Sequence, residues 1–254
     1  MNLAKAIYFA TIHPEFIRSY LKFGIFKSAI DKGIIDIHVI DLRDFAVDKH
    51  GSVDAYPYGG GDSMVMRPEP IKSAIDYVCS ESGVSPLVIY TSPKGVQWNQ
   101  EQAMELSVYL KQEASTADKE VDTFRVGDDA SQPLLFICGR FAGVDQRIID
   151  HYVHRQYSLG DFVISGGELA CLIIADSITR LVPGVVGNHE SVEVDSFSQA
   201  LDGCLEYPLY TRPVSFEGHT VPEVLLSGDH AKIKRWRQEM SKMLTARTRP
   251  DLLR

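Results

Sequence analysis

The segment SLGDFVISGGELACLIIADSITR, residues 158–180, joins two kinds of sequence. Apolar side chains surround Gly160, and then Gly166 and Gly167 come directly before a long apolar run that begins at Glu168. Glycine lets the backbone approach a ligand closely, and an apolar run of this length predicts a helix. The segment therefore predicts a loop of exposed amides and carbonyls beside a helix start, an arrangement able to hold an adenine by main-chain hydrogen bonds.

Upstream of this segment, short β-branched apolar runs alternate with stretches of helical spacing. The apolar runs cover residues 6–10, 35–40, 87–90 and 134–137. The helical stretches cover residues 15–32, 69–82, 99–113 and 145–153. Short runs of this kind are typical of strands buried on both faces of a parallel sheet. The alternation of strand and helix predicts an α/β layer fold.

Two breaks divide the chain into domains. Residues 112–132 are polar and acidic and predict an exposed insertion, and residues 187–194 follow a segment rich in proline and glycine and predict a linker. We therefore expect one domain over residues 1–186 and a small helical domain over residues 195–254. In the second domain, Ser227 or Asp229 is expected to cap a helix with apolar residues at helical spacing, which are Ile233, Trp236, Met240 and Met243.

The charge of the chain is distributed unevenly. The net charge is −8, yet residues 231–254 carry eight basic and two acidic side chains, so this end is positive and the rest of the chain is strongly acidic. Phosphate contacts require only a local basic patch. The pattern indicates either a basic module that binds nucleic acid or a solvated helix face, and charge alone does not separate these two interpretations.

Several classes of protein are disfavoured by the sequence. No apolar run reaches the roughly 18 residues of a membrane span. The four cysteines form no CxxC pair, and the first residues lack a signal-peptide cleavage region, so we expect a cytoplasmic protein without a structural metal or a disulfide framework. Neither GxGxxG after the first strand nor GxxxxGK[ST] occurs, so a dinucleotide fold and a phosphate-cradling loop are not supported.

Ten short motifs in one order give the sequence a specific resemblance that covers nearly the whole chain. It resembles the bacterial tRNA (guanine-N1)-methyltransferase family (TrmD), which belongs to the SPOUT class. The motifs are PYGGG, SPKG, CGRFAGVDQR, SLGDFVISGGEL, DSITRLVPGVVG, DSF, YTRP, VPEVLLSGDH, IKRWR and RPDLL. The resemblance implies an enzyme that transfers a methyl group from S-adenosylmethionine to N1 of guanosine 37, next to the anticodon.

The resemblance also implies a fold and a cofactor site. The expected fold is a SPOUT-type parallel sheet whose C-terminal part forms a deep trefoil knot, in a homodimer in which each active site is completed by the partner subunit. The knot loops are expected to bind the cofactor through Tyr90, Thr91, Ser92, Pro93, Gly139, Arg140, Leu159, Gly160, Asp161, Phe162, Val163, Ile164, Gly166 and Gly167.

Two residues match the family's catalytic pair. Guanine N1 carries a proton at neutral pH, so a base must remove it during methyl transfer, and Asp195 of DSF matches the proposed base. Arg180 matches the cation that stabilises charge on O6. Read without the family, Asp195 is a helix N-cap and Arg180 a cation at a helix C-terminus. Contacts to tRNA are expected from Ser191, Lys232, Arg235 and Lys242.

The chain also departs from the family pattern. Ala142 stands where the family has a carboxylate linked with a magnesium requirement, and Phe141, Ala55 and Val194 replace other usual residues. We therefore assign no residue to a metal, and dependence on Mg²⁺ stays open. The alternatives are a catalytically weakened tRNA-binding or cofactor-sensing paralogue, and another SPOUT RNA methyltransferase that acts on a ribose 2′-hydroxyl.

Overall fold

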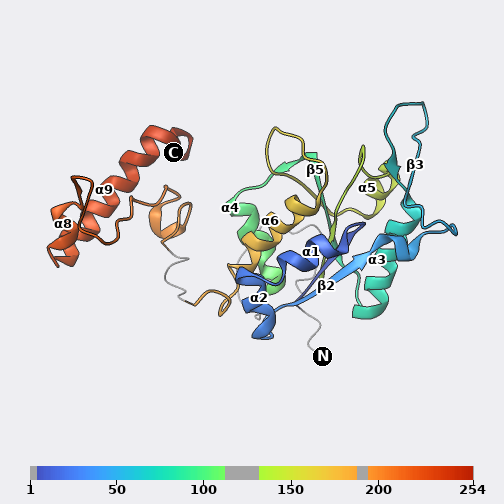
Figure 1. Ribbon diagram of the computed structural model, residues 1–254, viewed down its shortest axis with the longest axis horizontal. Helices are drawn as coiled ribbons and strands as arrows, with labels where there is room; N and C mark the ends of the chain where they lie inside the picture. The colour runs from blue at the N-terminus through green and yellow to red at the C-terminus, as the bar shows by residue number, and fades with distance from the viewer. Residues whose placement is uncertain (1–4, 112–131, 188–193, 254) are drawn as a thin grey trace, which may run out of the picture. The chain divides into compact units, whose positions relative to one another are not determined.

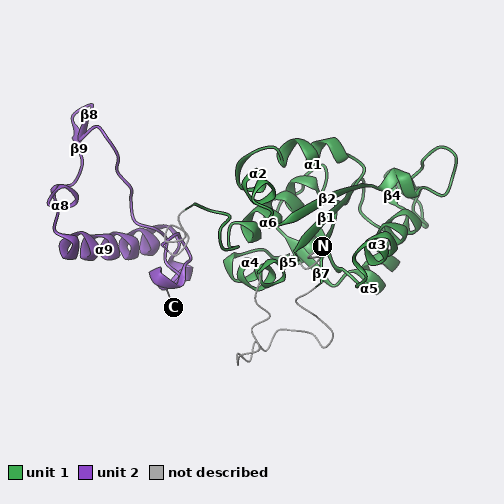
Figure 2. Ribbon diagram, turned by 90° about the horizontal axis from the view of Figure 1, so that it is seen from below, with its two compact units in different colours: residues 1–187 green, residues 188–254 purple. Residues whose placement is uncertain are grey.

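The computed structural model in Figure 1 describes residues 5–111, 132–187 and 194–253. The chain divides into two compact units, residues 1–187 and residues 188–254, which Figure 2 colours separately. The predicted insertion lies outside the described residues except for its last position, and so does most of the predicted linker.

Unit 1 is built on a parallel sheet of five strands. The strands are β1 (Ala6–Thr11), β2 (Asp36–Asp41), β5 (Leu87–Gln97), β6 (Leu134–Ile137) and β7 (Arg155–Ser158), in the order β2-β1-β6-β5-β7. Every residue of β1 and β6 is buried, which agrees with their continuous apolar sequence. The predicted α/β fold with a parallel sheet is therefore confirmed.

Helices cover both faces of this sheet (Figure 1). One apolar cluster joins Phe9, Ile89 and Phe136 of the sheet to α1 (Pro14–Tyr20), α2 (Gly24–Asp31), α4 (Gln100–Ser107) and α6 (Glu168–Thr179). The other cluster joins the alternate residues of the same strands to α3 (Pro68–Ser82) and α5 (Gln146–Tyr152). The alternation of side chains along each strand thus produces a three-layer core.

The structure corrects three of the predicted elements. A single helix over residues 15–32 is wrong, because the chain turns after Tyr20 and Gly24 has a φ of +59°, in the left-handed region that glycine tolerates. The helix over residues 99–113 ends at Ser107 and continues only as a 3-10 turn, η2 (Val108–Leu110). Strand β5 runs on past Tyr90 to Gln97, with a register shift between Thr91 and Val96.

Short elements complete unit 1. A 3-10 helix, η1 (Leu42–Phe45), follows β2. The strands β3 (Asp54–Ala55) and β4 (Val65–Met66) pair in an antiparallel ribbon, which carries the glycine-rich segment of residues 56–64 between them. Among the described residues, no helix is long and apolar enough to cross a membrane.

Unit 2 contains one long helix and several short elements. Its elements are η3 (Gln199–Leu201), β8 (Ser215–Phe216), β9 (His219–Thr220), α8 (Glu223–Leu226), α9 (His230–Thr248) and η4 (Pro250–Leu252). Asp229 is the cap of α9, because its Oδ1 accepts hydrogen bonds from the backbone N–H groups of Ala231 and Lys232, both at 3.1 Å. The prediction that Ser227 or Asp229 caps this helix is confirmed for Asp229.

Helix α9 packs against the residues after η3 through two small polar side chains. The buried Ser241 donates a hydrogen bond from its hydroxyl to the carbonyl of Leu205 at 2.6 Å, and the hydroxyl of Thr245 accepts one from the Leu205 amide at 2.9 Å. The apolar face includes Leu244, which is half-buried. Met243, which the sequence placed on this face, is wrong, because its side chain is exposed.

Candidate active site

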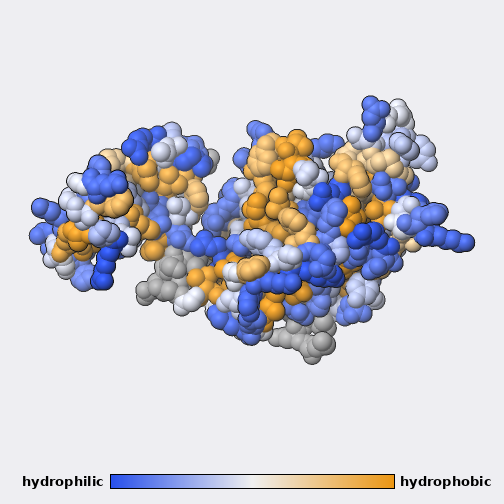
Figure 3. All heavy atoms as spheres, in the orientation of Figure 1, coloured by the Kyte–Doolittle hydropathy of each residue, from blue (hydrophilic) through white to orange (hydrophobic). Residues whose placement is uncertain are grey.

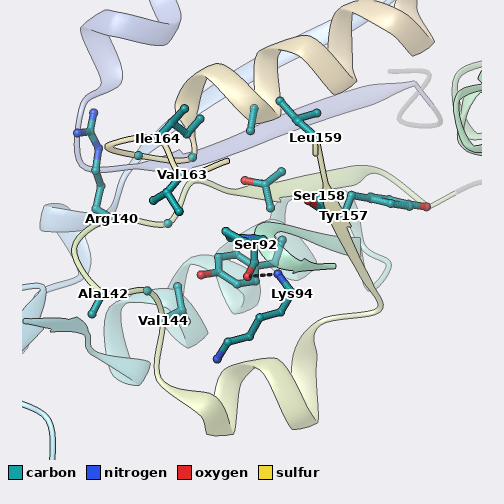
Figure 4. A pocket seen from close by; sticks show the side chains of 18 of the residues that line it. Ser92, Lys94, Arg140, Ala142, Val144, Tyr157, Ser158, Leu159, Val163 and Ile164 are labelled. Atoms are coloured by element: carbon teal, nitrogen blue, oxygen red, sulfur yellow. Dashed lines mark hydrogen bonds between the residues drawn. The ribbon is translucent and has the colours of Figure 1, made fainter. Parts of the chain in front are cut away.

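A cavity of about 380 Å³ lies where three neighbouring strands of the sheet end (Figure 4). Its walls come from the irregular part of β5, from the loop after β6 and from the loop after β7. In open parallel sheets, ligands bind beyond the carboxyl ends of the strands. The volume also falls within the ~300–1,000 Å³ range of small-molecule pockets. This cavity is therefore the candidate ligand site of unit 1.

Most residues that the sequence assigned to the cofactor line this one cavity. Thirteen of the fourteen do so, and the exception is Asp161, which is exposed and does not line it. Sequence reasoning missed further lining residues, and most of them adjoin assigned ones along the chain. They are Lys94, Phe141, Ala142, Gly143, Val144, Gln146, Ile149, Tyr157, Ser158, Ser165 and Ala170.

Glycines hold two walls of the cavity in direct backbone contact. The N–H of Gly167 donates a hydrogen bond to the carbonyl of Gly139 at 2.7 Å. A Cβ on Gly167 would lie 2.7 Å from the Gly139 nitrogen, and one on Gly139 would lie 2.8 Å from the ring of Tyr90. Real Cβ atoms do not approach other atoms so closely, so larger residues at either position would push the two loops apart.

The loop after β7 offers unused hydrogen-bond donors and apolar surface. Within the described chain, the backbone amides of Val163 and Ile164 donate to no other group. The amide of Gly160, in contrast, bonds to the hydroxyl of Ser158 at 3.2 Å. The side chain of Leu159 and the ring of Tyr157 add apolar surface to the same wall. The arrangement suits a ligand with a flat heterocycle that forms hydrogen bonds to the main chain.

The two aromatic and thiol groups at the base of the cavity stay protonated. Burial raises the pKa of Tyr90 above its ordinary value, although a hydrogen bond with the backbone of Val144 acts in the opposite direction. Burial also raises the pKa of the Cys138 thiol well above its ordinary value. Neither group is therefore an acid or base near neutral pH, and any proton transfer requires a different residue.

The described lining of the cavity contains no carboxylate. Its charged side chains are Lys94 and Arg140, and the guanidinium of Arg140 is already paired with Glu168. No group of three or more His, Cys, Asp or Glu residues with the spacing of a metal site occurs among the described residues. Because Mg²⁺ is held in proteins by one or two carboxylates, the lining does not fit a protein-bound Mg²⁺.

Arg180 and Asp195 lie in different units. Arg180 is the C-cap of α6, and its backbone N–H donates to the carbonyl of Asp176 at 3.1 Å. Burial raises the pKa of Asp176, and the nearby charge of Arg180 opposes that rise. Asp195 lies in a turn, where its carbonyl accepts a hydrogen bond from the Ser198 N–H at 3.1 Å. No α-helix starts there, so the alternative that Asp195 begins a helix is wrong.

The residues expected to contact tRNA are partly described. Lys232, Arg235 and Lys242 are all exposed on α9. Lys232 also forms an ion pair with the capping Asp229 at 3.2 Å. Ser191 lies outside the described residues. The structure therefore supplies an exposed basic helix in unit 2.

Comparisons with known proteins match the chain over both units. The family model of tRNA (Guanine-1)-methyltransferase TrmD matches residues 5–113 and 125–254. A tRNA (guanine-N(1)-)-methyltransferase of Clostridioides difficile is 43% identical over 243 residues, which cover 95% of this chain and 94% of that protein. The Geobacter sulfurreducens protein of the same name is 42% identical, with coverage of 96% and 89%.

A third relative of the same name, from Sulfurihydrogenibium, is 44% identical over 247 residues, which cover 97% of this chain and 87% of that protein. The matched ranges of the family model leave out residues 114–124, which lie within the segment expected to be an insertion. A match of this length includes both the pocket of unit 1 and the basic helix of unit 2. The chain belongs to the tRNA (guanine-N1)-methyltransferase family, TrmD.

Proposed function

We propose that this protein transfers a methyl group from S-adenosylmethionine to N1 of guanosine 37 in tRNA. The observation that carries the proposal is the coincidence of two findings. The family match runs through both units, and thirteen of the residues that this family resemblance assigned to the cofactor line one cavity. The tRNA substrate comes from the names of the relatives. A tRNA-modifying enzyme of this kind would work in the cytoplasm.

The cavity fits an adenosyl ligand. The free amides of Val163 and Ile164 suit the edge of an adenine, and the close packing of Gly139 and Gly167 leaves room for the ligand where side chains would otherwise stand. When bound, S-adenosylmethionine supplies a methyl group activated by the positive sulfur. The role of the chain is to hold that group in place and to exclude water from it.

The proposal includes the SPOUT trefoil knot. Its support is the path of the chain around the cavity. The loops after β6 and β7 are joined by the backbone bond between Gly139 and Gly167, and after β7 the chain continues into α6, which packs against α1, α2 and α4. A knot would fix the two loops to each other without a disulfide, as a rigid ligand site needs.

Asp195 and Arg180 perform the proton chemistry in this proposal. The carboxylate of Asp195 removes the N1 proton of guanine as the methyl group arrives, which turns a poor nucleophile into a good one. The negative charge that then develops on O6 is stabilised by the guanidinium of Arg180. Because that charge is absent before the reaction, this interaction lowers the barrier more than it strengthens binding.

A second copy of the chain is proposed to complete each active site. The support from unit 1 is an exposed apolar surface on the loop after β7 and on α6 (Figure 3), to which Phe162, Val163, Leu169 and Ile173 contribute. Leu169 and Ile173 are four residues apart and therefore share one face of the helix. Exposed apolar surface of this kind is typical of protein interfaces.

The basic side chains of α9 are proposed to contact tRNA phosphates. Lys232, Arg235 and Lys242 are exposed on a helix whose position within unit 2 is fixed by Ser241 and Thr245. Such contacts supply affinity that depends on salt but not on sequence. Recognition of the base to be methylated would then be the task of the active site.

A site-mapped methylation assay tests this function. The substrate is a tRNA transcript with guanosine at positions 36 and 37, methylated with labelled S-adenosylmethionine, digested and analysed by mass spectrometry. We expect 1-methylguanosine at position 37 and no product from a matched transcript with adenosine at that position. A methyl group on a ribose would indicate another SPOUT activity, and binding of tRNA without methylation would indicate a weakened paralogue.

A further inference from the structure

A buried carboxylate stands behind the cavity, and the chemistry proposed above does not use it. Glu168, the first residue of α6, is only 2% exposed. The hydroxyl of Thr11, which is fully buried at the end of β1, donates a hydrogen bond to its Oε1 at 2.8 Å. Buried carboxylates are rare unless they are paired, because the charge loses its hydration.

Arg140 supplies the paired charge. Its Nε lies 2.9 Å from Oε2 of Glu168 and directs its hydrogen bond to Oε1 at 3.1 Å. Within the described residues, Oε2 therefore has a charge partner but no hydrogen-bond donor of its own. Both charges thus depend on each other and on Thr11. We call Thr11, Arg140 and Glu168 the buried triad.

The guanidinium of Arg140 also fixes the loop after β7. A Cβ on Gly166 would lie 2.3 Å from its Nε, and its Nη1 donates to the carbonyl of Ser165 at 3.4 Å. Figure 4 shows the Arg140 side chain beside the loop that carries Val163 and Ile164, pointing away from Ser92 and Lys94. Its position is therefore set by protein groups on several sides.

The buried triad links three segments that are far apart in the sequence. Thr11 ends β1, Arg140 belongs to the loop after β6, and Glu168 follows directly on the loop after β7. Two of these segments are walls of the cavity. A buried ion pair is a poor source of net stability, since desolvation offsets the attraction, but it strongly disfavours other arrangements of the groups it joins.

We propose that Glu168 is a positioning residue for cofactor binding, which, held by Thr11 and Arg140, sets the spacing of the two loops that enclose an adenosyl ligand. The inference rests on the proposed function, because it concerns the same cavity. Glu168 itself does not line the cavity and acts through the loops. Loss of its charge leaves Arg140 unpaired and lets both loops move apart, while the rest of the fold keeps its core.

The test measures ligand binding by the full-length protein. Glu168→Gln keeps the shape of the side chain and removes its charge, and Thr11→Val removes one hydroxyl with almost no change in volume. Calorimetric titration with S-adenosylhomocysteine should show Kd raised about tenfold or more for Glu168→Gln and about threefold for Thr11→Val. Affinity for tRNA, which depends on other surfaces, should stay unchanged. At saturating S-adenosylmethionine, kcat should remain within about twofold while KM rises.

Thr179→Val is the matched control. Thr179 is a buried threonine on the same helix, it does not line the cavity, and its hydroxyl has no hydrogen-bond partner among the described residues. The same chemical change there should leave the Kd for S-adenosylhomocysteine unchanged. A loss equal to that of Thr11→Val would overturn the proposal, because it would show that any buried threonine in this region matters equally.

Further outcomes separate positioning from a general structural role. Unchanged affinity in Glu168→Gln overturns the proposal, and so does a parallel loss of affinity for tRNA. If Glu168→Gln does not fold, Thr11→Val decides the matter alone. The double variant Arg140→Gln/Glu168→Gln removes both charges and should bind the ligand at least as tightly as Glu168→Gln. Failure of the unaltered protein to bind S-adenosylhomocysteine would refute the proposed function instead.

Discussion

The pocket of unit 1 and helix α9 of unit 2 both carry basic side chains, but the chain holds them differently. Arg140 is fixed by a buried carboxylate and by packing against Gly166, whereas Lys232, Arg235 and Lys242 are exposed on a helix. The first arrangement depends on segments that meet only in the folded chain. The second depends on local helix formation and on the sum of charges. Changes of a single atom should therefore matter in the pocket, and only changes of several charges should matter on α9.

The largest expected effect concerns Asp195, which sharpens the comparison because a residue of unit 2 would control chemistry. Asp195→Asn removes the base but keeps the shape of the side chain. Single-turnover methylation should slow by about 10²- to 10⁴-fold, the usual contribution of a general base. Affinity for S-adenosylhomocysteine should not change, since that ligand binds in unit 1. Both quantities are measured on the same preparation.

Asp202→Asn is the control for this change. Asp202 belongs to the same region, is exposed and has a φ of +52°, a conformation that asparagine also tolerates. The control variant should retain its methylation rate. A rate loss of tenfold or less in Asp195→Asn would assign that residue a local structural role in its turn.

The next effect breaks the pocket by one methyl group. In Gly167→Ala, the added Cβ would lie 2.7 Å from the Gly139 nitrogen and 3.0 Å from the hydroxyl of Thr91. The backbone cannot retreat without separating the two loops, so the Kd for S-adenosylhomocysteine should rise by at least about tenfold. Gly187→Ala is the control, because a Cβ there meets nothing within 4 Å. Equal affinities in the two variants would contradict the tight contact between the loops.

On α9, three changes are needed for a clear effect. Replacing Lys232, Arg235 and Lys242 together by glutamine should weaken tRNA binding and reduce the slope of log affinity against log salt by up to about three contacts, each worth ~0.7 to 0.9. Ligand affinity in the pocket should be unaffected. The change of net charge is matched by replacing Lys22, Lys27 and Lys49 of unit 1. If the salt slope is the same in both triple variants, the basic face of α9 is only solvated.

The smallest expected effect is that of magnesium. The described lining of the cavity offers no carboxylate, and Glu168 is committed to Arg140 and Thr11. Removing Mg²⁺ with a chelator should therefore change the single-turnover rate by less than about twofold, provided that spermidine keeps the tRNA folded. Magnesium titration with a pre-folded transcript measures this. An absolute requirement would mean that an acid outside the described lining supplies the metal site.

The parts of the fold that were predictable are those in which local sequence and burial agree. Strands β1 and β6 are apolar throughout, and both are buried throughout. Strand β7 was not predicted, because it is an edge strand that begins with the polar residues Arg155 and Gln156, which are only half-buried. The break at Gly24 was also missed, since apolar spacing continues across it.

The cavity was predictable because its walls are marked by glycines and by family motifs. The role of Arg140 was not predictable, since its partner Glu168 lies 28 residues away and Thr11 much further. Local spacing carries no information about such contacts, which arise only when the ends of the strands meet. The cap of α9 at Asp229, in contrast, depends on neighbouring residues alone and was predicted.

The account's central claim is that a pocket in unit 1 and a base in unit 2 of another copy form one active site. It is tested by mixing two inactive variants, Gly167→Ala and Asp195→Asn, after joint unfolding and refolding. In a random mixture, half of the dimers contain both chains, and each of these has one intact site. Methylation of guanosine 37 should therefore return to about a quarter of the unaltered rate. If the mixture stays as inactive as the separate variants, pocket and base are not shared between subunits, and the claim is wrong.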